Sequence, residues 1–202
     1  MLRGLIVLST EIDNSTTITT VICPGFHPPH FTAQFLDRLG VDWGDNGLLV
    51  FPADLSSPLS PRALGEFLQA NLGARHSTPL IFIGFSAGVV AAMVGAYRWQ
   101  QSGGQVRGLI AIDGWGVGRV GNFPFYRISH DRFTHWSSGL LGAGDGGFYA
   151  DPPVEHLDLW RFPHQTWGWW LETGLVGLKT ASPMMASEAI FAILKKLGKL
   201  PN

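Results

Sequence analysis

The stretch Pro79-Leu80-Ile81-Phe82-Ile83-Gly84-Phe85-Ser86-Ala87-Gly88 decides the fold of this chain. Its apolar residues, Leu80 to Phe85, form a short run that is typical of a buried parallel strand. The run from Val89 to Tyr97 is rich in alanine and too long for a strand, so it predicts a buried helix. The order is therefore strand, sharp turn and helix, with Ser86 at the turn.

Three residues of this turn, Gly84, Ser86 and Gly88, spell the motif G-x-S-x-G. A nucleophile elbow needs small residues two positions before and after its serine, because the turn is tight and strained. The helix that follows adds a positive field that favours a developing oxyanion. At these residues the chain resembles the α/β-hydrolase superfamily, which implies a catalytic Ser86. In a chain with 26 glycines the alternative is a plain Gly/Ser turn.

Strand and helix patterns alternate along the rest of the chain. The last helix has Ser182 in the position of an N-cap and Pro183 in its first turn. The alternation predicts one α/β domain over residues 1–202, with a mostly parallel sheet, helices on both faces and no large lid. Expected strands are 5–9, 16–23, 47–51, 80–85, 106–112, 125–129 and 147–150; a turn is expected at 13–15, and further helices at 31–39, at 61–72 and at 182–197.

Composition limits the classes of function. Hydrophobic residues make up 46% of the chain and charged residues only 14%, which indicates a large core. A formal net charge of −1 provides no basic surface for nucleic acid. Glu11 and Asp13 follow the apolar start too soon for a signal peptide, and no apolar run approaches the roughly 20 residues of a membrane span. We expect a cytoplasmic protein without a transmembrane segment.

Metal and disulfide sites are not expected. The lone cysteine, Cys23, excludes an internal disulfide and a thiolate cluster. His27 and His30 are separated by two prolines, which prevent a helical pairing of their side chains, and no carboxylate cluster accompanies them. No cofactor is expected either.

The acid of a catalytic triad has two candidates, each at the end of an expected strand: Asp113 and Asp131. In the superfamily that the elbow resembles, the acid and then the histidine follow the serine in the chain. The resemblance favours Asp131, which lies one strand later, and Asp113 stays the alternative.

The base is expected among the four histidines that follow Ser86. His156 stands about one strand and one turn after Asp131, in a His-Leu-x-Leu stretch that resembles lipase-like and palmitoyl-thioesterase-like hydrolases. His164 begins a loop ahead of the last helix and is the alternative. His130 and His135 are expected to line the site or to bond to the backbone.

An oxyanion hole needs two backbone N–H groups rather than particular side chains. Ala87, directly after the candidate nucleophile, is expected to supply one. Phe26 is expected to supply the other, from a loop in which Gly25 allows an unusual backbone angle; the alternative is an ordinary Gly/Pro turn.

Four of the eight tryptophans crowd one late segment of the chain: Trp160, Trp167, Trp169 and Trp170. Such a cluster either forms an apolar acyl pocket or lipid-binding patch, or packs irregular loops against the core. Beside a serine nucleophile, it favours an apolar acyl substrate over a peptide.

The sequence therefore predicts a serine hydrolase of the carboxylesterase, lipase or thioesterase type, acting through an acyl-enzyme on a small ester or thioester, lipids included. Two alternatives remain open: a non-catalytic binding protein of the same fold, and an acyltransferase. Residues 113–116 and 155–160 also resemble a small cyanobacterial group of the superfamily, which implies no substrate. The oligomeric state stays open.

Overall fold

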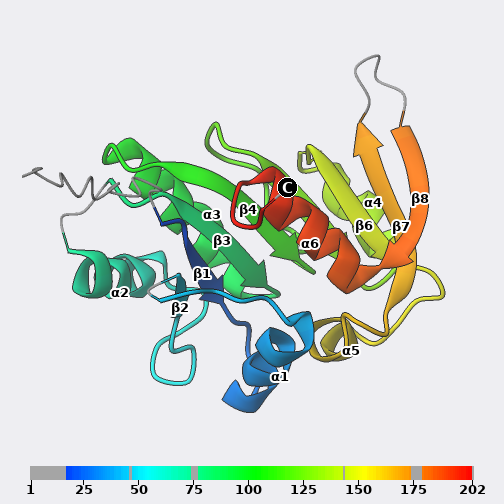
Figure 1. Cartoon of the computed structure of the whole chain (residues 1–202), viewed down its shortest axis with the longest axis horizontal. Helices are drawn as coiled ribbons and strands as arrows, with labels where there is room; N and C mark the ends of the chain where they lie inside the picture. The colour runs from blue at the N-terminus through cyan, green and yellow to red at the C-terminus, as the bar shows by residue number, and fades with distance from the viewer. Residues whose placement is uncertain (1–16, 46, 74–76, 143, 174–178, 202) are drawn as a thin grey trace, which may run out of the picture.

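The computed structural model describes residues 17–45, 47–73, 77–142, 144–173 and 179–201 (Figure 1). The strand expected at 5–9 and the turn expected at 13–15 lie outside these residues. The described residues form one eight-stranded sheet in the order β2-β1-β3-β4-β5-β6-β7-β8. Its strands are β1 Thr19–Cys23, β2 Leu48–Val50, β3 Leu80–Phe85, β4 Val106–Ile112, β5 Phe125–Ser129, β6 Gly146–Ala150, β7 Trp167–Thr173 and β8 Lys179–Met185.

The sheet is mostly parallel, as the sequence predicts. Strands β1 to β6 pair in parallel, whereas β7 pairs antiparallel with β6 and with β8. The antiparallel pair of β7 and β8 forms one edge of the sheet (Figure 1).

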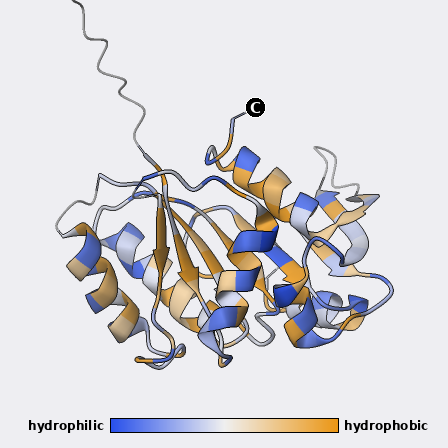
Figure 2. Cartoon of the chain, turned by 60° about the horizontal axis from the view of Figure 1, so that its bottom comes forward, coloured by the Kyte–Doolittle hydropathy of each residue, from blue (hydrophilic) through white to orange (hydrophobic). Residues whose placement is uncertain are grey.

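Helices cover both faces of the sheet. Along β3, Ile81 and Ile83 pack toward α1 (Pro29–Leu39), α5 (His156–Arg161) and α6 (Ala186–Lys196). Leu80 and Phe82 pack toward α2 (Pro61–Leu72) and α3 (Gly88–Gln101). Figure 2 accordingly shows apolar strands between helices that carry both apolar and polar residues. No described helix is long and apolar enough to cross a bilayer. Helix α4 spans Arg132–Gly139.

The last helix begins later than the sequence predicts. Ser182 and Pro183 do not cap it but lie in β8, where they pair with Trp170 and Trp169 of β7. Proline is tolerated there because β8 lies at the edge of the sheet that the described residues form, where none of them pairs with its other side. Helix α6 starts only after Met185, whose backbone N–H donates to the Glu188 carboxylate at 2.8 Å.

Candidate active site

The turn after β3 carries Ser86 and leads directly into α3. Ser86 adopts a φ of 52°, a left-handed conformation that is strained for a residue with a side chain. A Cβ atom added at Gly84 would lie 2.8 Å from the Val89 Cα atom, and one at Gly88 would lie 2.1 Å from the Cys23 carbonyl oxygen. Only glycine fits at either position, so the spacing of the motif follows from the packing of β3 against α3 and β1.

Asp113 follows the neighbouring strand β4 and is also left-handed, with a φ of 51°. Its side chain is only 1% exposed. Three N–H groups point at its carboxylate: His130 donates from its backbone N–H to Oδ1 at 2.9 Å, and the Nδ1 atoms of His130 and His156 lie 2.9 Å and 2.8 Å from Oδ2.

His156 is the first residue of α5, and its ring is fixed from two sides. Nδ1 contacts Asp113, and the ring stacks on Phe85 at 4.8 Å between centroids. A hydrogen on Nδ1, donated to the carboxylate, leaves Nε2 as an acceptor. The tautomer required of a general base is therefore favoured by the contact with Asp113.

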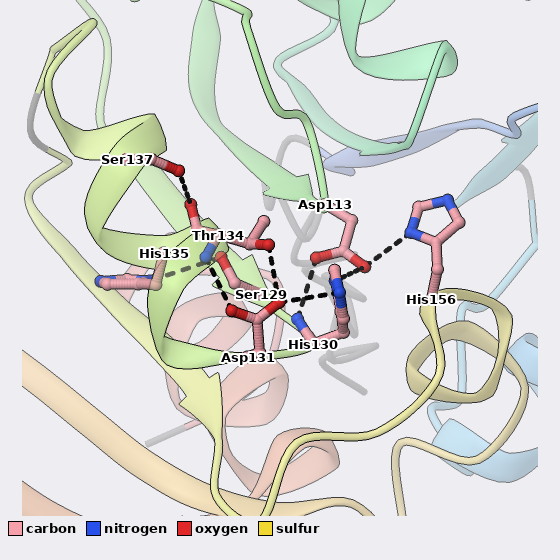
Figure 3. A network of polar contacts seen from close by, with 8 residues as sticks. All are labelled: Asp113, Ser129, His130, Asp131, Thr134, His135, Ser137 and His156. Carbon is pink, nitrogen blue, oxygen red and sulfur yellow. Dashed lines mark hydrogen bonds and ion pairs between the residues drawn. The ribbon is translucent and has the colours of Figure 1, made fainter.

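The sequence favours Asp131 as the carboxylate beside His156, but the structure brings Asp113, the alternative, into contact with that ring. Asp131 caps α4, and its carboxylate accepts hydrogen bonds from the backbone N–H of Thr134 at 2.8 Å and from its hydroxyl at 2.6 Å. It also lies 2.8 Å from the Nε2 atom of His130. Figure 3 shows Asp131 on the far side of His130 from His156, so the carboxylate of Asp131 is committed elsewhere.

The charges of this network follow from its contacts. Burial alone would raise the pKa of Asp113, but the hydrogen bonds from His130 and His156 outweigh it and hold that pKa below its usual value. The contact with Asp113 raises the pKa of His130 despite partial burial. Both ring nitrogens of His130 face carboxylates, so both carry hydrogens in the imidazolium form.

We expect the His130→Gln variant to lose stability in a pH-dependent way. The folded pKa of His130 is raised, so its stabilisation is complete below the unfolded pKa of about 6.5 and disappears as the pH rises through the folded pKa. Loss of charge-assisted hydrogen bonds costs about 1.5–3 kcal/mol each. Urea unfolding at pH 6 should therefore reveal a larger deficit than at pH 9. His30 is exposed, so the variant His30→Gln serves as the control. An equal loss of unfolding free energy by His130→Gln at both pH values would contradict the charged form of His130.

One cavity of about 600 Å³ brings the candidate residues together. Ser86, Ala87, Asp113, His130 and His156 all line it. The other lining residues are mostly apolar: Leu59, Val90, Trp115, Val117, Phe133 and Thr134.

The alternative base, His164, does not line this cavity. Its Nδ1 atom is buried, and no described residue forms a hydrogen bond with it. Among the two histidines considered for the base, the geometry therefore brings only His156 to the cavity that holds Ser86.

Ala87, one of the two expected oxyanion donors, directly follows Ser86, and the loop that carries the other, Phe26, lies against Ser86 at Gly25. A Cβ atom at Gly25 would lie 3.0 Å from the Ser86 Cβ atom and 3.0 Å from the Phe85 carbonyl oxygen, so the loop after β1 passes directly against the elbow. Among the described residues, no acceptor takes the backbone N–H of Phe26 or of Ala87. Both groups are thus available to a ligand at this edge of the sheet.

The tryptophan-rich segment serves mainly as packing. Trp160 is fully buried and stacks on Phe35 at 3.7 Å between centroids, and Trp170 is 6% exposed in the same core. Trp167 is 46% exposed. All four tryptophans of the segment are described, and none lines the cavity around Ser86.

Asp113, His130 and His156 are also the residues best arranged to hold a metal ion, since one ligand atom from each lies within 4.8 Å of the others. A tetrahedral ion with bonds of about 2.0–2.1 Å keeps its ligand atoms about 3.4 Å apart. The contacts of 2.8 Å and 2.9 Å at Asp113 are shorter than that and match hydrogen bonds.

The sequence predicts that His130 lines the site or bonds to the backbone, but not that its ring contacts Asp113. Asp113 follows β4 and His130 follows β5, and these strands are parallel neighbours in the sheet. Their carboxyl ends therefore meet at one edge, where ligands of open α/β sheets bind. The sequence contains Asp113 and His130, each directly after or near the end of a strand, but only the strand order shows that the two residues lie next to each other.

Comparison with known proteins concerns the fold. No protein-family model matches the chain, and no curated protein matches its sequence. Among solved structures it is similar to YbtT, a type II thioesterase from the yersiniabactin NRPS/PKS biosynthetic pathway, with a TM-score of 0.55 and 14% identity. The match covers 92% of this chain and 94% of that chain, so it extends over nearly the whole architecture.

Proposed function

The chain has the α/β-hydrolase fold, and on that premise we propose that it is a serine hydrolase that cleaves esters or thioesters of apolar acyl groups. The observation that carries the proposal is the contact of 2.8 Å between Nδ1 of His156 and Asp113, in the cavity that also contains the left-handed Ser86. Residues far apart in the sequence supply the nucleophile, the base and the acid that the chemistry needs.

The proposed reaction proceeds in two halves. Ser86 Oγ attacks the acyl carbon while Nε2 of His156 takes its proton, and Asp113 stabilises the imidazolium that forms. The backbone N–H groups of Phe26 and Ala87 donate to the oxyanion. The intermediate then collapses: the C–S or C–O bond breaks, and the leaving sulfur or oxygen takes the proton of the imidazolium and departs as a thiol or alcohol. Water, activated by the same histidine, then attacks the acyl-enzyme, which releases the carboxylic acid and restores the Ser86 hydroxyl.

The substrate class follows from the walls of the cavity. Leu59, Val90, Trp115, Val117 and Phe133 offer an apolar surface, and no described acidic residue other than Asp113 lines it. Such walls suit an acyl chain better than a charged or peptide substrate. The thioesterase activity named for the similar structure supports including thioesters. All the described strands belong to one sheet, and the described helices pack on its two faces. This supports treating the chain as one domain.

Labelling with a fluorophosphonate probe tests the proposal. We expect the wild-type protein to be labelled on the peptide that contains Ser86, because His156 activates its hydroxyl. His156→Ala should abolish labelling, whereas His164→Ala, the matched histidine variant, should retain it. Treatment with EDTA should leave labelling intact, which separates a serine mechanism from a metal-dependent one. A folded wild-type protein that stays unlabelled would overturn the proposal.

A further inference from the structure

A second cavity, of about 420 Å³, lies on the opposite side of α4 from the candidate active site. Phe133 and Thr134 of this helix line the cavity around Ser86, whereas Arg132, His135 and Trp136 line the second one. In Figure 3, His135 points away from Asp113 and His156. The volume falls within the range of roughly 300–1,000 Å³ that small-molecule sites occupy.

The second cavity contains a buried cation, Arg127, that forms no ion pair with any residue in the described part of the chain. Arg127 of β5 is 3% exposed and donates hydrogen bonds to the carbonyl oxygens of Val117 and Gly142 at 2.9 Å and 3.3 Å. Its guanidinium also lies 4.7 Å from the centre of the Phe125 ring. These contacts engage the Nε and Nη2 atoms of Arg127 but bring no formal negative charge.

No acidic residue that the structure describes offsets this charge. Among the described residues, none forms an ion pair with Arg127, and none of the cavity's lining residues is acidic. Asp145 is engaged by Arg119 and by the backbone N–H of Phe125. Burial without a nearby carboxylate therefore lowers the pKa of Arg127. Buried charges are usually paired, so the arrangement is incomplete without an anion.

Apolar side chains surround this cation. Trp136 of α4 and Leu140, which directly follows this helix, line the cavity and are 65% and 72% exposed. Leu171 of β7 lines it as well. A bare inorganic anion would leave these side chains in water, whereas an anion attached to an apolar chain would cover them.

We propose that this cavity binds a carboxylate carried on an apolar chain, with Arg127 as the buried counter-charge, Arg132 as a second cation, and Trp136 and Leu140 against the chain. The site is separate from the candidate active site. Binding requires no turnover, so the proposal stands or falls independently of the proposed hydrolase activity.

Titration of the ¹⁵N-labelled protein with decanoate tests this site by NMR. We expect decanoate to shift the amide resonances of four glycines that line the cavity: Gly139, Gly144, Gly146 and Gly147. Decanol, which lacks the charge, and inorganic phosphate, which lacks the chain, should each bind at least tenfold more weakly. Shifts confined to residues around Ser86, or equal binding of decanol, would overturn the proposal.

Variants make the test specific to the cavity. Arg127→Met should weaken decanoate binding at least tenfold, and Arg127→Lys should retain part of the wild-type affinity. Arg98 is an exposed arginine of α3, and its variant Arg98→Gln should bind decanoate as the wild type does. Because the loss of Arg127 also removes contacts that hold two loops, Gly139→Leu provides a second test. A Cβ atom at Gly139 meets no other atom within 4 Å, so leucine fills the cavity without strain and should abolish binding. Undiminished binding by the folded Gly139→Leu variant would contradict the site.

Discussion

Ser86→Ala should reduce kcat for hydrolysis of an acyl thioester by roughly 10⁵- to 10⁶-fold, because loss of the nucleophile removes the acyl-enzyme route altogether. The residual rate over water would come from the oxyanion donors and from binding, which the variant retains. Steady-state kinetics with a decanoyl thioester, after removal of the last traces of wild-type enzyme, would measure the loss.

The variant should fold normally, so a loss of rate reports on chemistry. Serine and alanine both carry a Cβ atom and meet the same strain at a φ of 52°. The backbone N–H of Ser86, which donates to the Ile112 carbonyl at 2.9 Å, is unchanged by the substitution. Urea unfolding should give a free energy within about 0.5 kcal/mol of wild type. A folded variant that keeps more than a tenth of the rate would exclude Ser86 as the nucleophile.

The tight turn at Ser86 was predictable from sequence because its cause is local. Gly84 and Gly88 are required by close approach to atoms of α3 and β1, and such a steric requirement leaves a readable pattern of small residues around the serine. The strands from 80 to 129 were predictable for a similar reason. Each is short and mostly apolar, and its apolar side chains belong to the two core clusters.

The last third of the fold was less predictable because competing local signals overlap. Ser182-Pro183 has the form of a helix start, yet the segment pairs with β7. The aromatic residues of β7 provide a strand-forming partner with its own apolar side chains, and Trp170 joins the core. Tertiary pairing therefore overrides a cap pattern that would suffice in isolation.

The acid was ambiguous because position along the chain does not determine which carboxylate turns inward. Asp113 and Asp131 both follow a strand, but only Asp113 adopts a left-handed backbone conformation, with a φ of 51°. Gly114 follows it, and a Cβ atom at Gly114 would lie 2.6 Å from the Val89 side chain. The turn after β4 is thus held close to α3, with Asp113 buried beside His156, whereas Asp131 begins α4 and caps it. Neither distinction is visible before the strands are assembled.

Asp113→Asn should therefore lower kcat by roughly 10⁴-fold, whereas Asp131→Asn should stay within about tenfold of wild type. The amide introduced by Asp113→Asn would present an N–H₂ group or a weaker acceptor to Nδ1 of His156, so the ring loses both its tautomer and the charge that stabilises its imidazolium. The Asp131→Asn change alters the cap of α4 and the contact between Asp131 and Nε2 of His130. Neither of these two contacts involves Ser86 or His156.

The pH profile of the two variants distinguishes orientation from general destabilisation. The pKa of Asp113 lies below its usual value, so Asp113 stays ionised across the working range of a histidine base and its contribution is lost only as the pH falls through that lowered value. Loss of rate in Asp113→Asn should accordingly persist from pH 6 to pH 9 in protein that remains folded by circular dichroism. If Asp131→Asn instead carried the larger loss, the orienting acid would be Asp131, reached through His130, and the direct contact of Asp113 with His156 would be structural.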